Sequence, residues 1–187
     1  QETWSKFRPN AKRISVFCYP GAPLRKWLEN LGSLKEDIDV LLTHGHAEQL
    51  SLYGQQTLQL PSNLQLLSIP FVSQDEYDWV LSQCDFNIVR GEDSFVRAQL
   101  AGKPFIWHIY PQEDRAHEVK LAAFLDLYLE EADQELRLAI IAAMTWAMPS
   151  EWFGILDQWS VYAKGWRTQL LKKQGDGGLA ARLLRFT

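Results

Sequence analysis

Residues 84–110, CDFNIVRGEDSFVRAQLAGKPFIWHIY, constrain the fold more than any other stretch of the chain. Residues 85–89 are rich in β-branched and aromatic types, and the apolar residues of 94–101 recur at helical spacing. Gly102 is placed to end that helix, and an apolar run over 105–109 follows it. This order predicts a βαβ unit, in which the two strands lie parallel and the helix crosses one face.

The turn between the first strand and the helix carries four polar residues and one glycine, Arg90, Gly91, Glu92, Asp93 and Ser94. Such a turn lies at the carboxyl end of a parallel strand, which is where these sheets bind ligands. The helix start offers unpaired amides, Gly91 allows close approach, and Arg90 supplies a forked cation. These features fit a phosphate or diphosphate, while the two carboxylates would repel it unless they face a sugar hydroxyl or a cationic substrate.

A purely structural interpretation of the same turn stands beside this one. Asp93 or Ser94 would be the N-cap of the helix, and Glu92 a first-turn acid favoured by the helix dipole. Arg90 would then be a surface ion-pair partner. Because N-caps followed by acidic first turns are common, the spacing alone does not decide between the two interpretations.

The rest of the chain supplies the elements that a larger sheet needs. Apolar, β-branched runs predict further strands over 14–19, 39–43 and 64–71. Helical spacing predicts helices over 24–31, 73–84, 116–129, 136–143, 152–166 and 179–186. Alternating strands and helices followed by helices alone predict an α/β fold, a Rossmann-like parallel sheet with helices on both faces. The aromatic residues of the last helices are expected to be core.

A second stretch with candidate binding residues leads into the helix predicted over 73–84. Ser73 and Glu76 have the spacing of a capping box, which is a sufficient structural role. A functional interpretation adds that Phe71 stacks on a nucleobase while Gln74 or nearby backbone reads its edge. Because this helix feeds into the strand before Arg90, base and phosphate sites would be neighbours.

Three further groups have weaker signals. Phe17 and Tyr19 end the first strand at the same expected edge, and from the residues alone core or rim packing is favoured for both. His44 and His46 flank a glycine, but no third ligand with fitting spacing is visible, so a loop at the pocket edge is favoured over a metal site. His108, near a strand end, is favoured as a satisfied core histidine.

Composition bounds the class of protein. The 187 residues, 47% hydrophobic and 12% aromatic, describe a globular domain with its own core. The net charge of -4 gives no basic field for nucleic acid or an acidic membrane, and an acidic face would suit a cationic protein acceptor better. Cys18 and Cys84 lie in apolar runs, as buried thiols of a cytoplasmic protein would. No apolar run approaches about 18 residues, so no membrane span is expected, and residues 1–4 lack the pattern of a signal peptide.

The central stretch, RGEDSFVRAQLAGKPFIWHIYPQEDRAH, resembles the signature of the EarP proteins, bacterial protein-arginine rhamnosyltransferases that modify translation elongation factor P. The similarity runs through nearly the whole chain and is clearest over 14–120. It implies the carboxy-terminal half of a GT-B glycosyltransferase. Residues 1–13 would be a linker from a missing amino-terminal acceptor domain, and 14–187 a donor-binding domain with a helical carboxy-terminal cover. The family's general base, an aspartate, has no counterpart here.

The resemblance also implies a reaction and its residues. The donor would be dTDP-L-rhamnose, with no other cofactor and no metal, and rhamnose would pass with inversion to an arginine of elongation factor P. Glu92 would have a catalytic part, with Arg90 stabilising the departing diphosphate. The expected donor contacts are Phe17, Tyr19, Phe71, Gln74, Tyr77, Arg90, Gly91, Glu92, Asp93 and Ser94. Expected partners are elongation factor P and the missing domain, without nucleic acid or membrane; the alternative is a non-catalytic nucleotide-binding module.

Overall fold

The computed structural model describes residues 4–43 and 61–174. In this part of the chain, five strands form one sheet: β1 Lys12–Val16, β2 Ile38–Leu42, β3 Leu64–Ser68, β4 Phe86–Arg90 and β5 Phe105–His108. Their order is β3-β2-β1-β4-β5, and every neighbouring pair is parallel. The strand order reverses between β1 and β4, and in such sheets the carboxyl edge at the reversal is the ligand crevice.

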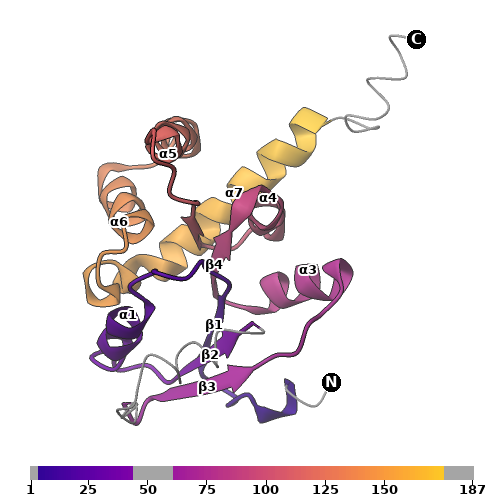
Figure 1. Ribbon diagram of the computed structural model, residues 1–187, viewed down its shortest axis with the longest axis vertical. Helices are drawn as coiled ribbons and strands as arrows, with labels where there is room; N and C mark the ends of the chain where they lie inside the picture. Colours follow the sequence, from indigo (N-terminus) through magenta and orange to yellow (C-terminus); the bar gives the residue numbers. More distant parts are fainter. Residues whose placement is uncertain (1–3, 44–60, 175–187) are drawn as a thin grey trace.

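The helices are α1 Leu24–Leu31, α3 Gln74–Gln83, α4 Gly91–Ala101, α5 Ala116–Tyr128, α6 Gln134–Met144 and α7 Leu156–Gln174, with short 3-10 turns at Trp4–Lys6, Pro149–Glu151 and Phe153–Ile155. They cover both faces of the sheet (Figure 1). Trp27 of α1 packs in one cluster with Val40, whereas Val80 of α3 packs in another with Leu41. Successive side chains of a strand point to opposite faces, so α1 and α3 lie on opposite sides. The predicted Rossmann-like fold is confirmed.

Several predicted boundaries are wrong, and three of them move site residues. The first strand ends at Val16, so Phe17 and Tyr19 follow β1 instead of closing it. The third ends at Ser68, which leaves Phe71 in the connection to α3. The central helix begins at Gly91, earlier than expected, and Gly91 there adopts a φ of 64° that most other residues avoid. The predicted helix over 179–186, and His44 and His46, lie outside the described residues.

The core is built from large aromatic side chains. Trp152 and Trp159, which precede and lie within α7, are fully buried, and both rings contact Phe86 of β4. The prediction that these tryptophans are core is therefore confirmed. Cys18 and Cys84 are both buried, as the apolar runs around them indicated.

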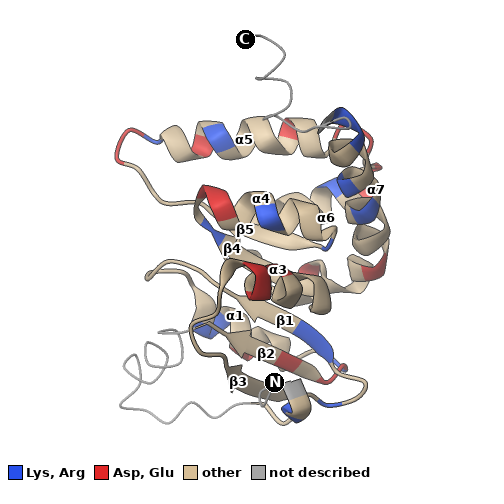
Figure 2. Cartoon of the chain, turned by 90° about the vertical axis from the view of Figure 1, so that its right-hand side faces the viewer, with Lys and Arg blue, Asp and Glu red and all other residues tan. Residues whose placement is uncertain are grey.

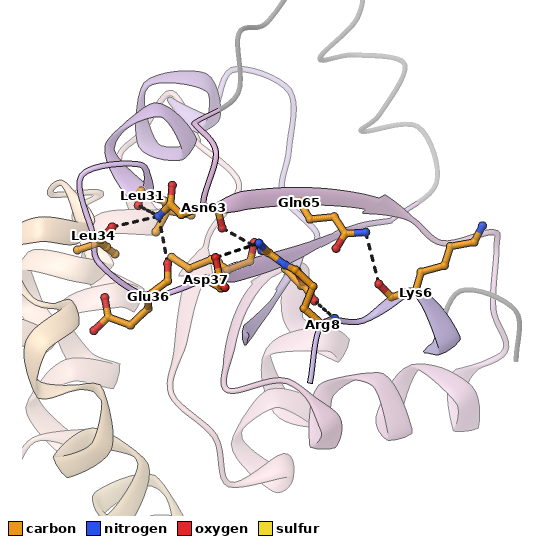
Figure 3. A network of polar contacts seen from close by, with 10 residues as sticks. Lys6, Arg8, Leu31, Leu34, Glu36, Asp37, Asn63 and Gln65 are labelled. Atoms are coloured by element: carbon orange, nitrogen blue, oxygen red, sulfur yellow. Dashed lines mark hydrogen bonds and ion pairs between the residues drawn. The ribbon is translucent and has the colours of Figure 1, made fainter. Parts of the chain in front are cut away.

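Arg8 ties the start of the described chain to the sheet (Figure 3). Its Nε donates to Oδ1 of the fully buried Asp39 at 2.7 Å, and its backbone N donates to Oδ2 at 2.8 Å. Its Nη2 donates to the carbonyls of Ile38 and Asn63 at 2.8 and 2.9 Å. Part of the predicted linker over 1–13 thus packs on the sheet, and β1 begins within it. That this segment comes from an acceptor domain stays a prediction.

Candidate functional site

Arg90 lies at the point where the strand order reverses. It is the last residue of β4, and its guanidinium carbon lies 4.1 Å from the ring centroid of Phe17 and 5.0 Å from that of Tyr19, both just beyond β1. Its Nη1 donates to the carbonyl of Cys18 at 3.2 Å. Two aromatic faces and one carbonyl therefore hold the fork in place.

This cation has no acidic partner among residues 4–43 and 61–174. The ion pairs of that part of the chain involve other arginines and lysines, and Arg90 makes none of them. The interpretation of Arg90 as a surface ion-pair partner thus finds no support there. A half-buried guanidinium without a carboxylate at a ligand-binding edge is suited to an anion, because phosphate oxygens accept the paired hydrogen bonds that it offers.

The start of α4 is fixed against the neighbouring strand. The carbonyl of Gly91 accepts from Nε1 of Trp107 at 2.9 Å, and a Cβ on Gly91 would lie 3.4 Å from the hydroxyl of Tyr19. The N-cap is Arg90, with no side-chain cap, so the expectation of Asp93 or Ser94 as N-cap is wrong.

Ser94 is the buried member of this turn. Its hydroxyl accepts from the backbone N of Arg90 at 3.1 Å and donates to the carbonyl of the same residue. The side chain therefore braces the strand-to-helix turn from within. That Ser94 also contacts the donor stays a prediction.

The two acidic residues of the turn have different surroundings, although both lie at the acidic start of α4 beside the basic end of β4 (Figure 2). Asp93 accepts from Nε of Arg97 at 2.8 Å, and Nη1 of Arg97 also reaches Asp78 of α3 at 2.8 Å. Glu92 is 80% exposed and has Lys120 of α5 at 3.9 Å. Arg97 thus links Asp93 of α4 to Asp78 of α3, and Glu92 is the more exposed of the two carboxylates, at 80% against 70% for Asp93.

Helix α3 begins at the same edge and reaches the site through one ring. The predicted capping box of Ser73 and Glu76 is present. Tyr77 contacts Phe17 edge to face at 5.8 Å, and within the described residues its buried hydroxyl has no hydrogen-bond partner. Burial raises the pKa of Tyr77 above its usual value. Phe71 is 88% exposed, and Gln74 opens the helix in an exposed position.

Two residues that sequence reasoning did not assign to the site also border it. His108 ends β5 beside Arg90 in the strand register, and its Nδ1 accepts from the backbone N of Tyr19 at 3.0 Å. The exposed ring of Tyr110 lies 5.2 Å from that of Tyr19. Burial, together with the charge of Arg90, lowers the pKa of His108 to about 4. The only available signal was that His108 lies near the end of a predicted parallel strand and that Tyr110 directly follows it.

Within the described part of the chain, neither a metal-binding group of side chains nor a membrane-spanning helix is found. Among residues 4–43 and 61–174, no three His, Cys, Asp or Glu side chains are grouped so that they could hold a metal ion. Over the same residues, no helix has the length and apolar character needed to cross a bilayer.

Comparison with known proteins shows which family the chain belongs to. The sequence model of the elongation-factor P (EF-P) rhamnosyltransferase EarP matches residues 1–187. The chain belongs to the EarP family. The protein-arginine rhamnosyltransferase of Pseudomonas putida is 35% identical, over 95% of this chain and 50% of that protein. The enzyme of the same name from Shewanella oneidensis is 53% identical, over 78% of this chain and 32% of that protein. This EarP-family chain thus spans about half the length of the P. putida relative.

Solved structures agree with the family and the fold. The structure that describes EarP-mediated arginine glycosylation of translation elongation factor EF-P matches with a TM-score of 0.80 and 31% identity, over 96% of this chain and 61% of that one. MurG of Acinetobacter baumannii matches with a TM-score of 0.50 and 16% identity, over 88% of this chain and 48% of that one, which bears on the fold alone. The EarP-family chain is a Rossmann-like domain of the GT-B type, as the resemblance implied.

Proposed function

We propose that this chain binds the donor dTDP-L-rhamnose in a protein-arginine rhamnosyltransferase, and that the rhamnose passes with inversion to an arginine of elongation factor P. The observation that carries the proposal is Arg90, a cation without an acidic partner in the described chain, held at the β1/β4 edge by the rings of Phe17 and Tyr19. Family membership supplies the sugar and the acceptor.

The transfer separates charge in a way that this edge can stabilise. The anomeric C–O bond breaks, positive charge builds on the sugar, and the electron pair leaves with the diphosphate. Arg90 and the amides at the start of α4 can receive that diphosphate without a metal ion. A guanidinium nitrogen of the acceptor forms the new bond from the opposite face, which inverts the anomeric carbon. Its proton passes to a general base, which we place in the acceptor domain beyond this chain.

Glu92 has the position of a group that meets the acceptor. It is two residues after Arg90, and its carboxylate faces solvent at the start of α4. A carboxylate can hold the guanidinium of an incoming arginine through paired hydrogen bonds, or it can orient a sugar hydroxyl. Arg97 holds Asp93 at 2.8 Å, whereas Lys120 lies 3.9 Å from Glu92, so among the carboxylates of this turn we assign the acceptor contact to the more loosely paired Glu92.

Nucleobase recognition falls to the residues that lead into α3. Phe71 is exposed in the connection that runs from the carboxyl edge of the sheet to α3, and Gln74 follows at the first position of α3. A base stacked on an aromatic ring contributes about 1–3 kcal/mol. The thymine of the donor would therefore lie on Phe71, with Gln74 beside its edge.

Calorimetric titration of the 187-residue chain with dTDP, UDP and ADP tests the proposal. We expect a preference for dTDP, and we expect Phe71→Ala to weaken dTDP binding about tenfold. Val161→Ala, a truncation of another largely exposed apolar side chain, on α7, is the control and should leave binding unchanged. Equal binding of all three nucleotides would instead indicate a general nucleotide-binding module, and absence of binding would refute the proposal.

A second measurement tests the reaction. The chain alone should bind the donor without turning it over. When it is mixed with an amino-terminal acceptor domain, the donor and elongation factor P, the mass of elongation factor P should rise by one deoxyhexose. The buried cysteines Cys18 and Cys84 support a reducing, cytoplasmic setting for this reaction.

A further inference from the structure

The segment after β1 is held by a side chain from the far side of β4. His108 ends β5, and its Nδ1 accepts the backbone N–H of Tyr19 at 3.0 Å, while the two rings meet edge to face at 5.7 Å. The residue before Tyr19 is Cys18, whose carbonyl accepts from Arg90. One imidazole therefore fixes the main chain at Tyr19, in the segment whose Cys18 carbonyl and Tyr19 ring both contact the guanidinium of Arg90.

This hydrogen bond specifies the state of the imidazole. Nδ1 can accept only when it carries no proton, so the proton of neutral His108 must be on Nε2. Burial and the charge of Arg90 lower the pKa of His108 to about 4, which keeps the ring neutral at pH 7. No ionisation of His108 near neutral pH competes with the contact to Tyr19.

Trp146 supports His108 from behind at some conformational cost. It has a φ of 62° at the end of α6, where its N–H bonds the carbonyl of Ala143 and the next N–H bonds that of Ala142. This pattern is a Schellman motif, and the left-handed position in it is usually glycine. The bulky ring nevertheless packs edge to face on His108 at 5.3 Å and on Trp27 at 6.4 Å. A tryptophan in place of glycine points to a required side chain.

We propose that His108, backed by Trp146, is a positioning residue of the donor site: its Nδ1 fixes the main chain at Tyr19, so that the rings of Phe17 and Tyr19 hold Arg90 ready for the diphosphate. This inference rests on the proposed function and adds to it a residue that need not touch the donor. Its role is to keep the aromatic cradle of Arg90 in place before the donor arrives.

Two substitutions that differ in one methylene test the role of Nδ1. In His108→Asn the amide oxygen lies close to the place of Nδ1 and can accept from Tyr19. In His108→Gln the amide lies near the place of Nε2, so the N–H of Tyr19 loses its acceptor. We expect H108N to bind dTDP within about threefold of the unmodified chain and H108Q to bind about tenfold more weakly, the effect of one lost hydrogen bond.

Amide hydrogen exchange of the ligand-free chain gives a readout that a general packing role would not move. The Tyr19 amide should exchange slowly in the unmodified chain and in H108N, and rapidly in H108Q. If H108Q does not fold, Trp146→Gly relaxes the left-handed backbone while removing the ring behind His108. That variant should show the same loss of affinity and of Tyr19 protection.

The outcomes separate this inference from the proposed function. If the unmodified chain prefers dTDP but H108Q binds it as tightly as H108N, the positioning role of His108 is overturned and the donor site stands. If the unmodified chain does not bind dTDP, the donor site falls and this role falls with it. Weak binding by H108Q, restored in H108N, supports both.

Discussion

Replacement of Arg90 is the sharpest test of the proposed site, because the side chain has contacts that stabilise the fold and a separate proposed role in binding. Within the folded chain, its guanidinium carbon lies 4.1 and 5.0 Å from the centroids of two aromatic rings, and the guanidinium donates one hydrogen bond to the carbonyl of Cys18. Each cation–π contact is worth about 0.5–1 kcal/mol and the hydrogen bond about 1 kcal/mol. Arg90→Ala should therefore lower the free energy of unfolding by about 2 kcal/mol.

Towards the ligand, the remaining donors of the Arg90 fork can bond two oxygens of a diphosphate. Charge-assisted hydrogen bonds contribute about 1.5–3 kcal/mol each, and the two are not additive, so about 3 kcal/mol is expected for the pair. That energy corresponds to a Kd for dTDP about 150-fold higher in Arg90→Ala. Arg90→Lys keeps the charge but not the fork, and about half of that energy, a tenfold rise in Kd, should be lost.

Isothermal titration with dTDP measures both variants, and a urea unfolding curve of each confirms that it is folded at the titration temperature. Arg25→Ala, which breaks a surface pair with Glu29 on α1, removes an arginine elsewhere and should change neither quantity measurably. A folded Arg90→Ala chain that binds dTDP within threefold of the unmodified chain would refute the diphosphate site. An equal loss in the lysine and alanine variants would contradict the argument from the fork.

Two further predictions concern stability. Arg8→Ala leaves the buried carboxylate of Asp39 without its charged partner and should cost about 3 kcal/mol of unfolding free energy in urea, against less than about 0.5 kcal/mol for Arg25→Ala; equal costs would show that the first pair is no more than a surface contact. The folded-state pKa of His108, about 4, lies below its unfolded value, so its stabilising contribution is present above about pH 6.5 and is lost as the pH falls towards 4. Allowing for partial solvent exposure, the loss in free energy of unfolding is about 1.5 kcal/mol. H108N should not show this loss, so profiles of stability against pH that run parallel in H108N and the unmodified chain would disprove the prediction.

The features that the sequence predicted correctly are those set by local rules. Gly102 closes α4 with a φ of 66°, the left-handed conformation that a glycine at a helix end signals. Ser73 and Glu76 bond each other across the first turn of α3, as their spacing required. The parallel sheet followed from alternating strands and helices, because short crossovers leave few other arrangements.

The direction of individual side chains in the central turn could not be predicted in the same way. Ser94 had the residue type of an N-cap, yet it bonds the backbone of Arg90 from inside the helix, because Gly91 starts the helix earlier. Asp93 pairs with Arg97, four residues on, and Asp78 of α3 shares the same guanidinium. That second acid comes from another element, so the turn by itself carries no sign of it.

The contacts that make the turn a site are between segments far apart in the chain, and the topology explains why they meet. Because crossovers between parallel strands are right-handed, in this strand order the chain leaves β1 towards one face of the sheet and leaves β4 towards the other, where α4 packs on α3. The residues after the two strands, Tyr19 and Gly91, therefore approach each other at one edge with no crossover helix between them. Neighbouring β5 then brings His108 within reach of Tyr19. If this reasoning holds, disturbing the hydrogen bond between Tyr19 and His108 should weaken the binding of an anion at Arg90, although neither of the two bonded atoms touches that anion. In a site made by the turn alone, the same change would leave anion binding unaffected.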